Sequence, residues 1–150
     1  MTRTVSVPRR SVLPCALVKD TLRFGPVAIS ALEVVGHDLH RPECVLPQRD
    51  GSLFVPDWRG GVTQVRADGS QETWLARGTT DIRPNGIAML ADGSFLLANL
   101  GADGGVWQLH RDGRLVPFVT NIEGSPLPPA NFVTVDALGR TWISVSTRRV

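Results

Sequence analysis

PNGIAMLADGSFLLANL, the stretch at residues 84–100, has two close counterparts in the same chain. They are PECVLPQRDGSLFVPDW at residues 42–58 and ANFVTVDALGRTWISVS at residues 130–146. The three align without a gap, and their central glycines, at positions 51, 93 and 139, lie 42 and 46 residues apart. Each stretch has β-forming residues on both sides of a turn at that glycine, which is the pattern of a β-hairpin. Repetition at this spacing predicts a series of similar structural units.

A second kind of hairpin lies between these stretches. GGVTQVRADG at residues 60–69 matches GGVWQLHRDG at residues 104–113, and the closing glycines are 44 residues apart. In both hairpins Asp-Gly supplies the positive φ that a tight turn requires. Two hairpins in each period make a four-stranded unit, the size of one β-propeller blade. No stretch sustains a helical apolar period, so we predict an all-β fold with little helix.

The chain holds enough repeats for about two and a half to three blades. A propeller ring closes with roughly four to eight blades, so we expect an incomplete ring and interpret the chain as the N-terminal half of a propeller. We expect an irregular segment at residues 1–25 and the propeller half at residues 26–150. Residues 27–35 read VAISALEVV and are expected to form a strand that closes the ring. An incomplete ring leaves an apolar blade face exposed, which favours self-association of the fragment.

Composition narrows the functional classes. The formal net charge is +2 and 42% of the residues are hydrophobic, so neither nucleic acid nor a membrane is an expected partner. The two cysteines, Cys15 and Cys44, form no CxxC pattern, which favours a reducing, cytoplasmic location without excluding secretion. A Gly-x-Ser-x-Gly elbow and a glycine-rich phosphate loop are both absent from the sequence, which argues against a serine hydrolase and a nucleotide-binding enzyme.

Three polar residues share one phase of the repeat. Glu43, Asn85 and Asn131 each stand eight residues before the glycine of their hairpin. That position begins the strand expected to be innermost in its blade, so the three side chains should converge at one end of the central channel. Carboxylate and amide oxygens suit hard cations such as Ca²⁺, Mg²⁺ or Mn²⁺. An asparagine before glycine, as at Asn85, is also a common turn former, and that alternative stays open.

The motifs around these residues resemble one known family. Residues 41–45 (RPECV), 83–93 (RPNGIAMLADG) and 129–142 (PANFVTVDALGRTW) are similar to motifs of the family of senescence marker protein (regucalcin), gluconolactonase and luciferin-regenerating enzyme. The resemblance covers roughly residues 30–150. It implies a six-bladed propeller with one divalent metal ion in its channel.

The resemblance also implies roles for individual residues. Glu43 stands where the family has a metal-ligating glutamate, and Asn131 where it has an asparagine that contacts metal, directly or through water, or substrate. Asn85 and Arg83 would contact substrate. The family's Glu-Gly-Pro is Glu-Cys-Val here, and the aspartate that usually follows the second asparagine is Phe132. Two further ligands and the general base would lie beyond Val150, so no catalytic residue is assigned within the chain.

The function implied is a divalent-metal-dependent hydrolase of lactones or related esters, with this chain lacking a complete active site. Ca²⁺ is the first expectation for the metal, with Mg²⁺, Mn²⁺ and Zn²⁺ as alternatives. The expected partner is a small lactone or sugar acid. Two other functions remain open: a non-catalytic propeller that serves as a binding scaffold, and a propeller similar to strictosidine synthase, which lacks the metal-ligating glutamate.

Overall fold

The computed structural model describes residues 26–78 and 80–145. The described residues fall into two separate units, divided between Glu33 and Val34, and the β-strands of the described residues lie in the second. The irregular segment expected at residues 1–25 lies outside the described residues, so that expectation stays a prediction.

The prediction of a strand at residues 27–35 is wrong. The segment instead contains the 3-10 helix η1 (Ile29–Ala31), and no strand among the described residues pairs with it. Its apolar side chains are exposed, up to 95% at Val34. High β-propensity forms a strand only where a neighbouring strand takes up the backbone hydrogen bonds.

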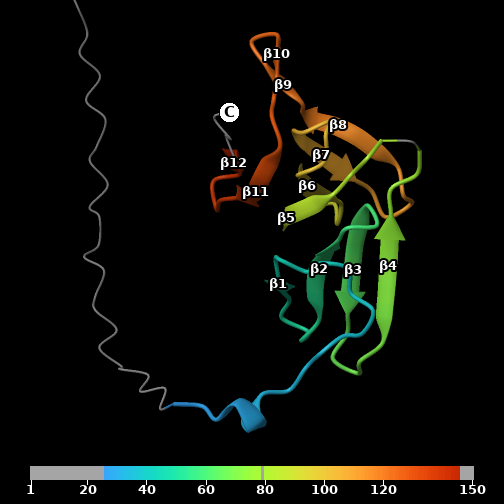
Figure 1. Cartoon of the computed structure of the whole chain (residues 1–150), viewed down its shortest axis with the longest axis vertical. Coiled ribbons are helices and arrows are strands. Elements are labelled where there is room, and N and C mark those ends of the chain that lie inside the picture. Colours follow the sequence, from blue (N-terminus) through green and yellow to red (C-terminus); the bar gives the residue numbers. More distant parts are fainter. Residues whose placement is uncertain (1–25, 79, 146–150) are drawn as a thin grey trace, which may run out of the picture. The chain divides into compact units, whose positions relative to one another are not determined.

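Two four-stranded antiparallel sheets form the body of the second unit (Figure 1). The first has the order β1-β2-β3-β4, and the second has the order β5-β6-β7-β8. Because neighbours in each sheet are also neighbours in sequence, each is a simple meander, as in a propeller blade. The strands are β1 (Leu46–Pro47), β2 (Leu53–Asp57), β3 (Gly61–Val65), β4 (Gln71–Leu75), β5 (Pro84–Met89), β6 (Phe95–Asn99), β7 (Val106–Leu109) and β8 (Leu115–Val119).

A third hairpin, β11 (Ala130–Val135) with β12 (Thr141–Val145), follows the same plan as the first two strands of a blade. Before it, β9 (Asn121–Ile122) and β10 (Ser125–Pro126) form a small exposed hairpin. The described residues therefore form two blades and half of a third, and the ring is not closed. The fold class predicted from the repeats is confirmed.

The turns explain why glycine sets the repeat. Glycine adopts φ between 75° and 84° in the turns at positions 51, 69, 93, 113 and 139, a region that other residues rarely enter. At all but the last of these glycines the preceding residue is an aspartate, which keeps an ordinary φ and accepts hydrogen bonds instead. In the turn at Gly93, Asp92 Oδ1 accepts the Ser94 N–H at 2.9 Å and the Ser94 hydroxyl at 2.5 Å. These bonds lower the pKa of Asp92 from its ordinary value.

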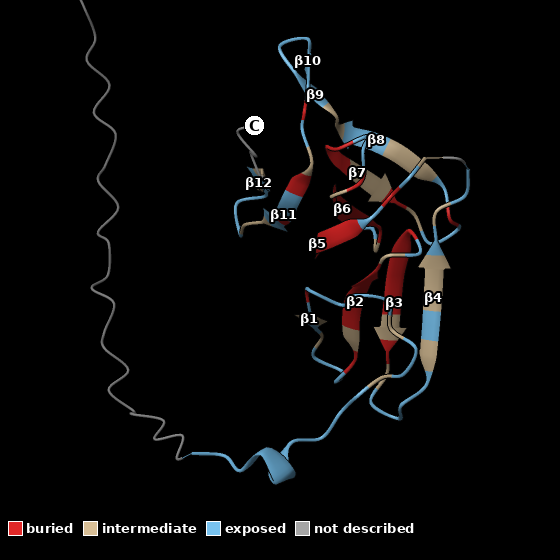
Figure 2. Ribbon diagram, in the orientation of Figure 1, coloured by how far each residue is buried: buried red, intermediate tan, exposed pale blue. Residues whose placement is uncertain are grey.

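Strand β6 lies at the centre of the core. Its residues are all buried (Figure 2), and alternate side chains enter two different clusters. Phe95 and Leu97 belong to the cluster shared with the first blade, whereas Leu96 and Ala98 pack with Ala130 and other residues of the third hairpin. A continuous apolar run is expected of a strand covered on both faces.

The third hairpin has one open face. Residues Phe132, Leu138 and Trp142 are 43%, 76% and 56% exposed, while Ala130 and Val133 are buried against the second blade. The described residues thus present the expected apolar surface. Self-association through it stays a prediction.

The third hairpin contains a carboxylate, Asp136, whose pKa is lowered. Asp136 accepts hydrogen bonds from Trp142 Nε1 at 3.0 Å, from the backbone N–H groups of Arg140 and Leu138 at 2.9 Å, and from Arg140 Nε at 2.6 Å. These bonds, that of Trp142 first, lower the pKa of Asp136 to about 2. A lowered pKa stabilises the fold above the unfolded value of about 3.9, and this contribution is lost as the pH falls through 2.

We expect carbon-13 NMR to show the Asp136 carboxyl titrating near pH 2 and Trp142→Phe to raise its pKa. The carboxyl of Asp112 contacts neither residue and serves as the internal control. An Asp136 pKa unchanged by the substitution would show that the indole does not hold the carboxylate.

Candidate functional site

Asn85 and Asn131 meet at the same edge of neighbouring sheets. Asn85 is the second residue of β5 and Asn131 the second residue of β11. The Asn85 Nδ2 group donates to Asn131 Oδ1 at 2.6 Å and to the Asn131 carbonyl oxygen at 3.1 Å. The repeat phase therefore brings these two predicted residues together.

Gly86 makes this close approach possible. A Cβ at position 86 would lie 2.6 Å from the Phe132 ring and 2.7 Å from the Phe132 Cα, closer than atoms can pack. Gly86 is therefore needed for the contact between β5 and β11. The reason is lack of space for a side chain and not backbone conformation, because φ at Gly86 is not positive. Of the two interpretations left open for Asn85, the turn former is wrong, because the residue lies within a strand.

The Asn85 side chain is buried with one atom unsatisfied. The residue is 6% exposed, and its Oδ1 has no hydrogen-bond partner among the described residues. The Asn85 NH₂ group must face Asn131, because the Asn131 backbone carbonyl can only accept a hydrogen bond. A buried acceptor without a donor costs about 1–3 kcal/mol. Such an atom marks a place where a ligand, an ion or water would be stabilising.

A hollow of about 300 Å³ lies along the inner strands. Its walls come from β1, β5 and β11 with their flanking residues. They include Ile87 and Ala88, which follow the Asn-Gly pair, and Phe132, which follows Asn131. The innermost strands of the three hairpins thus border one shared space, as expected of a propeller channel.

Glu43 does not begin its strand as predicted. β1 starts only at Leu46, because the chain turns before it: Arg41 has a φ of 54° and its carbonyl accepts the Glu43 N–H at 3.0 Å. The Glu43 carboxylate accepts a hydrogen bond from Arg41 Nε and its side chain is 41% exposed. The Arg41 guanidinium in turn stacks 3.8 Å from the Trp58 ring centroid. Glu43 has no hydrogen bond to Asn85 or Asn131 in the described structure.

Arg83 lies at the surface beside the Asn85 strand. Its side chain is 52% exposed and its Nε is 3.3 Å from Asp81 Oδ1. The backbone of Arg83 is held more firmly, because its N–H donates to Asn99 Oδ1 at 2.9 Å. The guanidinium has no hydrogen bond to either asparagine among the described residues.

Sequence reasoning missed two buried polar residues, Asp57 and Asn99. Each is the last residue of the second strand in its blade and is fully buried. Asn99 accepts the N–H groups of Arg83 and Gly101 and donates to the carbonyls of Asp81 and Gly104. It therefore fixes the loop that leads into Asn85. The repeat could have revealed them, because both residues stand six positions after the turn glycine of their hairpin.

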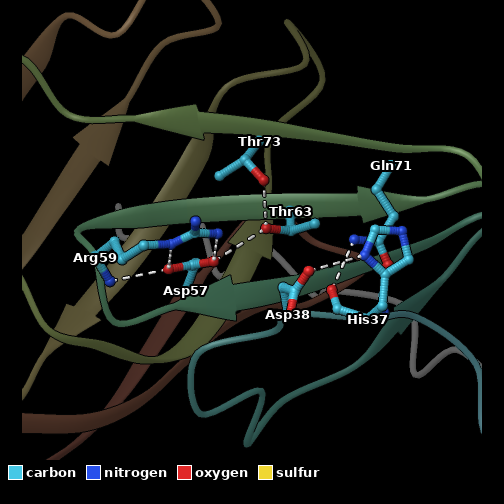
Figure 3. A network of polar contacts seen from close by, with 7 residues as sticks. All are labelled: His37, Asp38, Asp57, Arg59, Thr63, Gln71 and Thr73. Atoms are coloured by element: carbon cyan, nitrogen blue, oxygen red, sulfur yellow. Dashed lines mark hydrogen bonds and ion pairs between the residues drawn. The ribbon is translucent and has the colours of Figure 1, made fainter.

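Asp57 organises the corresponding end of the first blade (Figure 3). Its two carboxylate oxygens accept hydrogen bonds from Arg59 Nε at 2.9 Å, Arg59 Nη2 at 2.6 Å and the Thr63 hydroxyl at 3.2 Å. Burial acts to raise the pKa of Asp57, but the hydrogen bonds and charge of Arg59 hold it below its ordinary value.

The same view shows how the segment before Glu43 is attached to the first blade. The Gln71 side chain on β4 accepts the His37 N–H at 2.8 Å and donates to the His37 carbonyl at 2.9 Å (Figure 3). The His37 ring faces Asp38 at 3.4 Å, and both side chains are exposed. This attachment is therefore made through the backbone.

A divalent metal can be tested against the donors present. Within residues 26–78 and 80–145, no three His, Cys, Asp or Glu side chains gather as they would around a metal ion. The amide oxygens of Asn85 and Asn131 and the Glu43 carboxylate are hard donors that fit Ca²⁺ in kind. Within the described part of the chain, Asn85 Oδ1 accepts no hydrogen bond. The donors fit in chemistry but fall short of the usual six to eight.

No family model matches the chain, and no curated protein matches it in sequence. The described residues contain no helix long and apolar enough to cross a membrane.

Solved structures resemble it in fold. A gluconolactonase from Xanthomonas campestris is 18% identical, with a TM-score of 0.56 over 76% of this chain and 42% of the other. A putative gluconolactonase is 23% identical, with a TM-score of 0.51 over 75% and 45%. A catalytically inactive variant of virginiamycin B lyase from Staphylococcus aureus, solved with quinupristin, is 15% identical, with a TM-score of 0.54 over 72% and 36%.

The chain thus spans between 36% and 45% of the length of these structures. At such identities the likeness concerns the fold and leaves the chemistry open. Together with the meandering four-stranded sheets, it identifies the fold as that of a β-propeller.

Proposed function

We propose that this chain contributes part of the active site of a divalent-metal-dependent hydrolase that acts on lactones or related esters. The observation that carries the proposal is the Asn85–Asn131 pair, in which the buried Asn85 Oδ1 has no hydrogen-bond partner among the described residues. Both asparagines lie on strands that border the 300 Å³ hollow, although neither side chain lines it. The likeness to gluconolactonase structures supports the choice of reaction class.

Each residue has a definite task in this proposal. Asn131 and Glu43 hold the metal, directly or through water, and Asn85, Arg83 and Asn131 bind substrate oxygens. A bound cation, Ca²⁺ first, would polarise the lactone carbonyl and lower the pKa of a bound water. The general base is supplied from outside this chain.

Glu43 must leave Arg41 to take part. Both side chains are about half exposed, and exposed ion pairs contribute only about 0–1 kcal/mol. The cation–π contact with Trp58 leaves Arg41 a second partner when the carboxylate moves. The pair is therefore no obstacle to metal binding.

The test is hydrolysis of gluconolactone by the full-length protein that contains this chain, with and without Ca²⁺ or Mn²⁺. We expect Asn131→Ala and Glu43→Gln to lower kcat/KM by about 100-fold, the usual loss for one electrostatic contact to the reacting group. Calcium affinity, measured by calorimetry, should fall in parallel. Asn121→Ala, in the exposed β9 strand, is the matched control. Equal activity of wild type and Glu43→Gln would remove Glu43 from the mechanism.

One observation favours a non-catalytic scaffold as the second candidate. In this structure the Glu43 carboxylate is paired with Arg41, as in an ordinary surface ion pair. A scaffold would bind no metal, and the Asn85–Asn131 contact would serve only to join two blades. The calcium titration separates the two functions, because the scaffold shows no binding that depends on Asn131.

A further inference from the structure

A second hollow lies at the opposite end of the strands from Asn85. Its volume is about 560 Å³, and it lies between the first and second blades. Asn85 is near the start of β5, whereas this hollow is lined by Met89 at the end of β5 and by residues of the β1–β2 and β7–β8 turns. It adjoins the 300 Å³ hollow described above, with which it shares Gln48 and Met89, but neither Asn85 nor Asn131 lines it. The lining residues are Gln48, Arg49, Asp50, Ser52, Phe54, Gln64, Met89 and Arg111.

Arg111 has an unusual setting in this hollow. Its guanidinium carbon lies 4.1 Å from the ring centroid of Trp74, 5.0 Å from that of Phe95 and 5.1 Å from that of Phe54. Arg111 Nε donates to the Gly93 carbonyl at 3.0 Å. Among the described residues no carboxylate lies within ion-pair distance of it.

The two terminal nitrogens of Arg111 have no hydrogen bond to any of the described residues. Stacking on an aromatic ring uses the face of the guanidinium and keeps its edge free for hydrogen bonds. The hydrogen bond from Nε fixes the orientation of the fork, that is, of the two terminal N–H groups of the guanidinium. Partial burial lowers the pKa of Arg111 from its ordinary value, and the charge of Glu72, which acts in the opposite direction, does not offset it.

The other polar groups of the hollow favour an anion. Arg49 also lies in the wall and forms no ion pair within the described part of the chain. Asp50 is the acidic residue of the lining, and its Oδ1 accepts both the N–H and the hydroxyl of Ser52. The lining thus has two arginines against one engaged carboxylate. The charge of Glu72 also reaches Arg111, but Glu72 is paired with Arg66, so the site stays net positive.

We propose that this hollow binds a small oxyanion, a carboxylate or a phosphate, between the fork of Arg111 and the side chain of Arg49. The Gln48 and Gln64 amides provide further hydrogen-bond donors, and Phe54 and Met89 contact an apolar group attached to the anion. Bidentate binding of an oxyanion by arginine is among the stronger charge-assisted interactions in proteins. This site is independent of the proposed hydrolase activity.

The experiment is calorimetric titration of the whole chain with sodium phosphate and, separately, sodium benzoate, at constant ionic strength. We expect saturable binding of one anion per chain. Tighter binding of benzoate identifies an organic carboxylate as the ligand class, and tighter binding of phosphate identifies a phosphate.

Arg49→Gln is the decisive variant, because this exposed side chain has no packing role that would compromise folding. We expect it to weaken binding about tenfold, as the loss of one charge-assisted hydrogen bond does. Arg111→Lys should weaken binding by a similar factor, because lysine keeps the charge but lacks the fork. Arg114→Gln removes the same charge from an exposed side chain outside the hollow and should change the affinity by about twofold at most. Absence of saturable binding, or an equal loss in Arg114→Gln, would overturn the proposal.

Discussion

Replacing Phe95 with alanine is expected to lower the free energy of unfolding by about 3–5 kcal/mol, the usual cost of truncating a buried phenylalanine. Phe95 is fully buried in the cluster between the first and second blades. Its ring centroid lies 5.2 Å from that of Phe54 and 6.3 Å from that of Trp74. The substitution removes the ring that joins these two aromatics to β6 and opens a cavity beside them.

Urea unfolding followed by circular dichroism measures this loss. Phe118→Ala is the matched control, because Phe118 on β8 is 41% exposed and its truncation should change stability by only about 0.5 kcal/mol. Phe95→Leu should lie between the two, since leucine fills part of the space. Similar losses for Phe95→Ala and Phe118→Ala would mean that the blades do not pack around Phe95.

The hairpin plan was predictable because glycine is needed at a fixed place in each turn. Gly51, Gly93 and Gly139 all have positive φ, so aligning them aligned the strands on either side. The same register placed Asn85 and Asn131 together, because both stand at one distance from a turn and lie at matching register shifts of their hairpins, between Pro84 and Ile87 and between Ala130 and Phe132. Local chemistry and repeat phase were sufficient for these features.

Glu43 shows where phase alone fails. It has the same spacing from its glycine as the two asparagines, but Arg41 turns the chain and β1 has only two residues. Pro47, which has no N–H to donate, is the last residue of that strand, consistent with its shortness. The sequence shows the proline but does not show which way the preceding turn directs a carboxylate.

Features that depend on several distant strands could not be predicted. The setting of Arg111 is created by Phe54, Trp74 and Phe95, which lie on three different strands. An arginine after a histidine near an Asp-Gly turn looks like an ordinary surface residue. Likewise, the strand predicted at residues 27–35 had a suitable composition but no partner among the described residues.

Asp57→Ala is the second change with a large expected effect, a loss of about 3 kcal/mol in the free energy of unfolding. The residue is fully buried, and its removal leaves the Arg59 N–H without its acceptor and the Thr63 hydroxyl with only the Thr73 hydroxyl as a partner. Buried groups that lose a charged partner cost about 1–3 kcal/mol each. The Arg59 side chain is 42% exposed and can be rehydrated, which keeps the loss below that of a fully buried ion pair.

Asp57→Asn separates the hydrogen bonds from the charge. Asn99 occupies the equivalent position in the second blade, and its Oδ1 accepts the Gly101 N–H two residues later, as Asp57 accepts the Arg59 N–H. An asparagine at position 57 should therefore keep that bond and lose only the ion pair, at a cost of about 1 kcal/mol. Asp103→Asn, at an exposed loop residue, should be near neutral and serves as the control.

The pH dependence of these variants tests the same contact independently. Because the folded pKa of Asp57 is lowered, its charge stabilises the fold above the unfolded value of about 3.9, and that contribution is lost as the pH falls through the folded pKa. The turn aspartates titrate alike in wild type and Asp57→Asn, so the difference in stability between the two isolates Asp57. We expect urea unfolding to show that difference in full at pH 7 and shrinking below about pH 4. A difference that grows on acidification would mean that burial, rather than Arg59, controls this carboxylate.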